Sequence, residues 1–134
     1  MTHTIRKTFT LPVGVRAAFS LLTDARKIRS WSGQKGTVQA KIGGEFRMFD
    51  GWVTGNVLAY QPGKHLAYTW IPSDWKKGAT PSIVVYRFTR VGSKTRISLT
   101  HKGLPTKTIL RNHAAGWVEH VVDPLKAYLT KKGV

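Results

Sequence analysis

The stretch that decides the fold lies near the C-terminus, where residues 106–130 read TKTILRNHAAGWVEHVVDPLKAYLT. Apolar residues recur in it every three or four positions, which is the period of an α-helix with one buried face. These residues are Leu110, Ala114, Trp117, Val121, Leu125 and Tyr128. Thr106 or Thr108 can cap the first turn. The stretch therefore predicts a long C-terminal helix that packs on another layer.

Pro124 interrupts the middle of this helix. Proline has no backbone N–H, so one helical hydrogen bond is lost, and its ring crowds the carbonyl group four residues earlier. We expect either a kink at Pro124 or a second helical segment that starts at Asp123-Pro124.

A β-sheet is predicted as the layer that packs against the helix, from Thr37 to about Lys102. Short runs rich in Val, Ile, Tyr, Trp and Thr are separated by turn signals such as Gly43-Gly44 and Asp50-Gly51. Alternate residues share one face in three of these runs: Leu66, Tyr68 and Trp70; Val84, Tyr86 and Phe88; Thr95, Ile97, Leu99 and His101. Such alternation is typical of an antiparallel sheet with one buried face and one solvent-exposed face.

The segment before the sheet predicts one strand and two short helices. Residues 3–10 form the strand, and Pro12 suits the first turn of a helix. Asp24 can cap a second helix, which turns Ile28 and Trp31 inward. The fold class is therefore α+β, with a curved antiparallel sheet wrapped around the long C-terminal helix. We expect residues 1–134 to form a single domain.

The charge is strongly positive, because 22 Lys and Arg residues stand against 6 acidic ones, for a formal net charge of +16. Such a field favours polyanionic partners, which include acidic protein surfaces, nucleic acid and anionic lipid. The basic residues are scattered, so a solvated basic surface without a partner is the alternative interpretation. Nucleic-acid binding is motivated only by this charge and by residues such as Arg87, Arg96 and Lys102, and we expect it least.

Several function classes are disfavoured by composition. The chain has no cysteine, which argues against disulfides and thiolate chemistry. We find no apolar run of the roughly 20 residues that span a bilayer, and no signal peptide, so we expect a cytoplasmic protein. His113 and His120 would stand roughly 10 Å apart along one helix, too far to share a metal ion. We expect neither a metal nor a nucleotide cofactor.

A set of motifs, in this order along the chain, resembles one protein family. They are Trp31, Ile42-Gly43-Gly44-Glu45-Phe46, Gly51 and Gly55 flanking the next strand, Tyr68-Thr69-Trp70, Thr95 to His101, and His113 with Gly116-Trp117. Together they are similar to the START-like (SRPBCC) superfamily, and within it to the C-terminal domain of the activator of the heat-shock-protein-90 ATPase. The resemblance covers nearly the whole chain and implies the helix-grip fold. Pro124 and the high basic charge depart from the family pattern.

A hollow between a curved sheet and one long helix, lined by aromatic residues, is typical of an apolar ligand pocket. The alternative is that the large side chains fill it. The candidate pocket residues are Trp31, Phe46, Tyr68, Trp70, Tyr86, Phe88, Leu99, His101, His113, Trp117 and Val121. We expect Trp117 to pack on the sheet, with Gly116 leaving room for a strand.

His101 is the ionisable residue that alternation points inward. It can orient a ligand's polar group or act as an acid or base. The residues favour a core histidine bonded to a backbone carbonyl or a Tyr hydroxyl, because no acidic partner can be paired with it.

Three function classes therefore stay open. The first, which we prefer, is a binding domain for a small apolar or amphipathic molecule. The second is a protein-interaction domain for an acidic partner such as a chaperone. The resembling activators carry a further N-terminal domain, so the resemblance does not imply that this chain stimulates the chaperone. The third is an enzyme of the cyclase or hydrolase kind that uses His101, Tyr68 or Tyr86.

Overall fold

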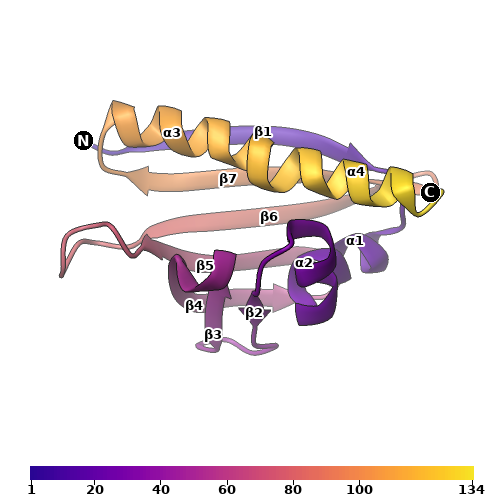
Figure 1. Ribbon diagram of the computed structural model, residues 1–134, viewed down its shortest axis with the longest axis horizontal. Helices are drawn as coiled ribbons and strands as arrows, with labels where there is room; N and C mark the ends of the chain where they lie inside the picture. The colour runs from indigo at the N-terminus through magenta and orange to yellow at the C-terminus, as the bar shows by residue number, and fades with distance from the viewer.

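The computed structural model describes residues 1–134 as a seven-stranded antiparallel sheet that curves around one long helix (Figure 1). The strand order is β1-β7-β6-β5-β4-β3-β2, so the first strand pairs with the last. The strands are β1 (His3–Leu11), β2 (Thr37–Val38), β3 (Glu45–Met48), β4 (Val53–Gln61), β5 (His65–Pro72), β6 (Ser82–Val91) and β7 (Lys94–Leu104). The predicted α+β class and helix-grip arrangement are confirmed.

Two short helices follow the first strand, α1 (Val15–Thr23) and α2 (Ala25–Ser32). The Asp24 side chain caps α2 as predicted, because its carboxylate accepts two backbone N–H groups of the first turn. One detail of the prediction is wrong. Gly14 is the N-cap of α1, so Pro12 lies ahead of the helix and outside its first turn.

The C-terminal helix has three parts, α3 (Lys107–Trp117), η2 (Val118–Val122) and α4 (Asp123–Lys131). Thr106 caps it, since its side-chain oxygen accepts the backbone N–H of Ile109 at 3.1 Å. None of the helices is both long enough and apolar enough to cross a membrane.

A new helical segment, α4, begins at Asp123 with Pro124 in its first turn, which agrees with the expected second segment. The segment η2 is a π-helical turn, in which the Asp123 N–H bonds to the Val118 carbonyl five residues earlier. The backbone keeps right-handed helical angles throughout this region. The wider turn accommodates the Pro124 ring, which would otherwise crowd the carbonyl group of His120.

The core lies between the inner face of the sheet and the helix. The predicted alternation on β5, β6 and β7 is confirmed, since the residues assigned to the inner face are all buried. From the helix, Trp117, Val121 and Leu125 pack against them. Phe46 on β3 stacks on Tyr68 with ring centroids 3.7 Å apart. Large side chains therefore fill the centre of the space that the sheet encloses.

At two positions of the motif set, the backbone geometry explains why the residue is glycine. Gly43 has a φ of +81° in the turn before β3, a conformation that favours glycine. Gly55 lies inside β4, where a Cβ atom would overlap the backbone carbonyl of Thr69 on β5. We predicted that Gly55 would flank this strand, so its position within the strand corrects that detail.

Candidate binding pocket

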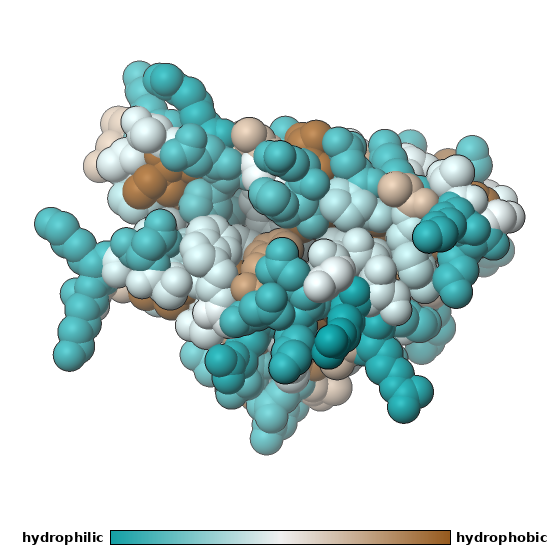
Figure 2. Space-filling model, in the orientation of Figure 1, coloured by the Kyte–Doolittle hydropathy of each residue, from teal (hydrophilic) through white to brown (hydrophobic).

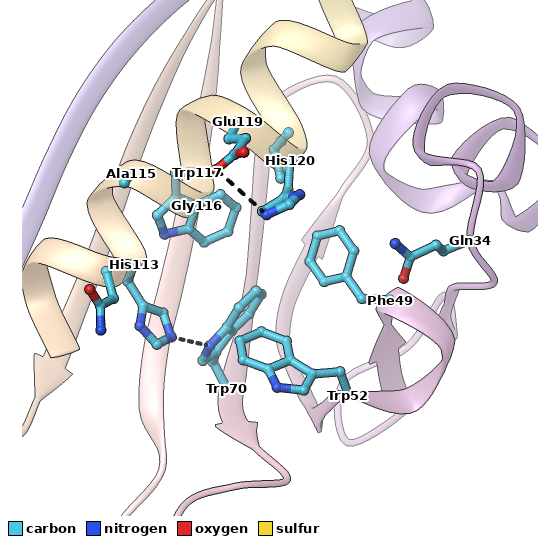
Figure 3. A pocket seen from close by; sticks show the side chains of 12 residues that line it. Gln34, Phe49, Trp52, Trp70, His113, Ala115, Gly116, Trp117, Glu119 and His120 are labelled. Atoms are coloured by element: carbon cyan, nitrogen blue, oxygen red, sulfur yellow. Dashed lines mark hydrogen bonds and ion pairs between the residues drawn. The ribbon is translucent and has the colours of Figure 1, made fainter.

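A pocket of about 530 Å³ opens where the helix passes the end of β5 (Figure 3). Half of the twelve residues that line it have aromatic rings: Phe49, Trp52, Trp70, His113, Trp117 and His120. The helix contributes three further residues to the wall, Ala115, Gly116 and Val121. Polar groups come from Gln34, Asn112 and Glu119. On this face of the molecule, hydrophilic side chains surround a hollow in which less hydrophilic residues show (Figure 2).

The aromatic rings of the pocket pack against one another along its wall. Phe49, Trp52 and Trp70 point toward the same space, with His120 opposite them on the helix (Figure 3). The Trp52 and Trp70 rings meet edge to face with centroids 6.2 Å apart, and Phe49 lies 6.3 Å from both Trp52 and His120. The Trp52 side chain is 40% exposed. An aromatic wall open to solvent is a surface on which a flat molecule can stack.

Phe49 is held in the pocket by an unusual backbone. Phe49 and Asp50 have φ values of 54° and 58°, and they are the only non-glycine residues of the chain with positive φ. The Asp50 carboxylate accepts the Lys35 N–H at 2.8 Å, and the Asp50 N–H donates to the Lys35 carbonyl at 3.0 Å. Strained conformations of non-glycine residues cluster at functional sites. The short helix η1 (Phe49–Gly51) is therefore a second reason to regard this pocket as a site.

His113 is neutral, and its tautomer is fixed by its neighbours. Its Nδ1–H donates to the Ile109 carbonyl at 3.1 Å, so Nε2 is free to accept the Trp70 indole N–H at 3.2 Å (Figure 3). Burial lowers the pKa of His113 below its ordinary value. Both ring nitrogens are thus used inside the protein, and His113 offers the pocket its ring face and edge.

His101 lies behind Trp117 in the core and does not line the pocket. The Trp117 indole N–H donates to His101 Nδ1 at 3.0 Å, so the ring proton is on Nε2 and donates to the Ser82 hydroxyl at 2.9 Å. That hydroxyl donates to the Trp70 carbonyl at 2.7 Å. Burial, with a smaller effect of nearby His113, lowers the pKa of His101 to about 3.

This chain of hydrogen bonds joins the helix to three strands, β5, β6 and β7, through one neutral histidine. Of the two interpretations left open for His101, the geometry shows the core histidine. Its partners are a serine hydroxyl and an indole, however, in place of the expected backbone carbonyl or Tyr hydroxyl.

The other candidate residues divide between the pocket and the core. Four of the eleven line the pocket, namely Trp70, His113, Trp117 and Val121. The remaining seven are buried in the core: Trp31, Phe46, Tyr68, Tyr86, Phe88, Leu99 and His101. Trp31 is a buried residue of α2 and donates its indole N–H to the Leu21 carbonyl at 2.7 Å.

Three aromatic residues of the pocket were not among the candidates, namely Phe49, Trp52 and His120. They come from an irregular segment and from the π-helical turn, where neither period 2 nor period 3.6 applies. The Asp50-Gly51 turn signal was the available indication for the first two residues.

Gly116 has a different role from the predicted one. A Cβ atom at this position would find its nearest neighbour at 3.8 Å, in the ring of His120, and no strand is close. Gly116 therefore leaves space in the pocket wall and makes no room for a strand. No group of three or more His, Asp or Glu side chains is placed as metal ligands would be.

Comparison with known proteins identifies the family. Residues 13–130 match the family model "Activator of Hsp90 ATPase homolog 1-like protein". The mouse "Activator of 90 kDa heat shock protein ATPase homolog 1" is 26% identical over 108 residues, which cover 81% of this chain and 31% of the mouse protein. The Dictyostelium discoideum homologue is 21% identical over 109 residues, covering 81% of this chain and 28% of that protein. The chain thus spans less than a third of the length of these curated relatives.

Solved structures show the same fold. The crystal structure of an HSP90 activator from Plasmodium falciparum superposes with a TM-score of 0.87 at 24% identity, covering 95% of this chain and 96% of that one. The strand order, the helix grip and the family match therefore agree, and the chain belongs to the Activator of Hsp90 ATPase homolog 1-like protein family.

Proposed function

We propose that this chain is a ligand-binding domain whose pocket takes a small, flat, apolar or amphipathic molecule. The observation that carries the proposal is the open aromatic wall of Phe49, Trp52 and Trp70. The pocket volume of about 530 Å³ lies in the range of small-molecule sites, which are mostly apolar with a few polar groups. The strained backbone at Phe49 and Asp50 supports the same interpretation.

Trp52→Ala is expected to weaken binding of a neutral aromatic probe, 2-naphthalenemethanol, by at least about tenfold, equivalent to ~1.4 kcal/mol. The substitution removes one stacking wall of the pocket, and because Trp52 is 40% exposed the fold should persist. Isothermal titration calorimetry measures the affinity. Leu58→Ala is the matched control, since Leu58 is 43% exposed and lies outside the pocket. Equal affinities for Trp52→Ala and the native chain would contradict the proposal.

We propose a second function, binding of an acidic protein surface, on the evidence of the outer face of the sheet. Strands β1, β5, β6 and β7 contain no Asp or Glu. Their solvent-exposed basic side chains include Arg6, Arg87, Arg96 and Lys102, and none of these four takes part in an ion pair. The curated relatives are named as activators of an Hsp90 ATPase. An acidic surface of such a chaperone would complement this face.

The double substitution Arg87→Glu with Arg96→Glu is expected to weaken binding to purified Hsp90 by at least about tenfold at low salt. Both side chains lie on the outer face, so the core is untouched. Biolayer interferometry at two salt concentrations measures the effect. Lys131→Glu with Lys132→Glu, at the C-terminal end of the helix, is the control of equal charge change. Binding that is insensitive to salt and to the first pair of substitutions would exclude this face.

A further inference from the structure

We propose that the pocket selects aromatic molecules that carry an amine and discriminates against aromatic carboxylates. This inference rests on the ligand-binding function proposed above and adds the chemical class of the ligand. It follows from the charges that line the pocket, from the hydrogen-bonding groups left free in it, and from the faces of its rings.

The charge lining the pocket is opposite in sign to that of the whole chain. The chain carries 22 Lys and Arg residues, yet none of the twelve lining residues is a Lys or an Arg. One of its six acidic residues, Glu119, does line the pocket. The Glu119 carboxylate lies on η2, 3.9 Å from the His120 ring nitrogen, and its side chain is 75% exposed (Figure 3). A bound carboxylate would meet this negative group and no permanent cation.

Three ring groups of the pocket already use their hydrogen bonds inside the protein, and the Gln34 and Asn112 amides can donate or accept and so favour neither charge. The indole N–H groups of Trp70 and Trp117 both donate to histidine nitrogens inside the protein, and are not available to a ligand. His113 uses both ring nitrogens in the same way. The Glu119 carboxylate, by contrast, can only accept. An ammonium group has three donors and would bind this oxygen pair with charge assistance.

The aromatic faces add a further preference for a cation. The face of an indole or phenyl ring is negative, so an ammonium group within about 6 Å of it is attracted. Trp52 and Phe49 both line the pocket, and their ring centroids lie 6.3 Å apart. A flat ring can therefore stack in the pocket while its amine lies between the aromatic faces and Glu119.

Three naphthalene probes with the same ring separate charge from shape: 2-naphthylmethylamine, 2-naphthalenemethanol and 2-naphthoate. Calorimetry at pH 7.5 and 150 mM salt, where exposed charges beyond about 8 Å are screened, compares their affinities. We expect the amine to bind at least about fivefold more tightly than the alcohol, the factor that one opposite charge gives at about 4 Å in water. The carboxylate should bind more weakly than the alcohol, although the net charge of +16 attracts anions.

The substitution Glu119→Gln tests whether this carboxylate causes the preference for the amine. The substitution should lower the affinity for 2-naphthylmethylamine about fivefold. Asp123→Asn is the matched control, because Asp123 is an exposed carboxylate four residues further along the helix and outside the pocket. It should leave the affinity for the amine unchanged. An unchanged amine affinity in Glu119→Gln, or tighter binding of the carboxylate than of the alcohol, would overturn the charge selectivity and leave ligand binding in place. Failure of all three probes to bind would overturn the proposed function itself.

Discussion

Trp117→Ala is expected to lower the free energy of unfolding by about 3–5 kcal/mol, as truncation of a large buried aromatic residue does. The Trp117 side chain is 3% exposed, and its ring packs 5.1 Å from that of Trp70 and 6.1 Å from that of Tyr86. The substitution also leaves His101 Nδ1 buried without its indole donor, which adds a desolvation cost.

Urea denaturation followed by circular dichroism measures this loss. Val118→Ala is the neighbouring control, because Val118 is 38% exposed and a surface substitution changes stability by about 0.5 kcal/mol or less. A loss below about 1 kcal/mol for Trp117→Ala would show that the ring does not hold the helix on the sheet.

Acid is expected to destabilise the protein through His101. The folded-state pKa is about 3, below the ordinary value of 6.5 for an unfolded histidine. Between these two values the unfolded chain binds a proton that the folded chain does not. Stability is therefore full above pH 6.5 and falls as the pH decreases, by up to about 1.4 kcal/mol per pH unit for this group. Burial also lowers the pKa of His113, which acts in the same direction.

Urea denaturation at a series of pH values between 7.5 and 4.5 measures this slope. His101→Gln removes the titrating group, so this variant should be less stable at pH 7.5 and should show a shallower slope. His120→Gln is the control, because the His120 side chain is 58% exposed, and its slope should match that of the native chain. A stability that stays constant from pH 7.5 to 4.5 would show that His101 is readily protonated in the folded protein.

The regular parts of this fold could be predicted from the sequence because they follow simple periods. Strict alternation in β6 and β7 assigned Tyr86, Leu99 and His101 to the buried face correctly. Asp24 was recognisable as a cap from its residue type and position. The π-helical turn before Pro124 was not predictable in the same way, because a proline also permits a kink or a new helical segment without such a turn, and only the surrounding packing decides between them.

The pocket was harder to predict because it is built from irregular segments. Phe49 enters it through a left-handed backbone conformation that phenylalanine rarely adopts. The partners of His101 depend on the pairing of β5, β6 and β7, which brings Ser82 to it from 19 residues away. The expected packing of one long helix on a curved sheet predicted a hollow lined by aromatic residues. Which of them fill the core and which line the pocket depends on side-chain packing that no periodicity encodes.

The response of the five tryptophan indole N–H signals to 2-naphthalenemethanol, in two-dimensional ¹H–¹⁵N NMR spectra, tests most directly whether the pocket is the binding site. Trp52, Trp70 and Trp117 line the pocket, whereas Trp31 is 6% exposed and bonds to Leu21 away from it. We expect saturable shifts of the three pocket signals, largest for Trp52, while the Trp31 signal stays in place. An absence of shifts at Trp52 and Trp70, or equal shifts at Trp31, would contradict the assignment of this pocket as the binding site.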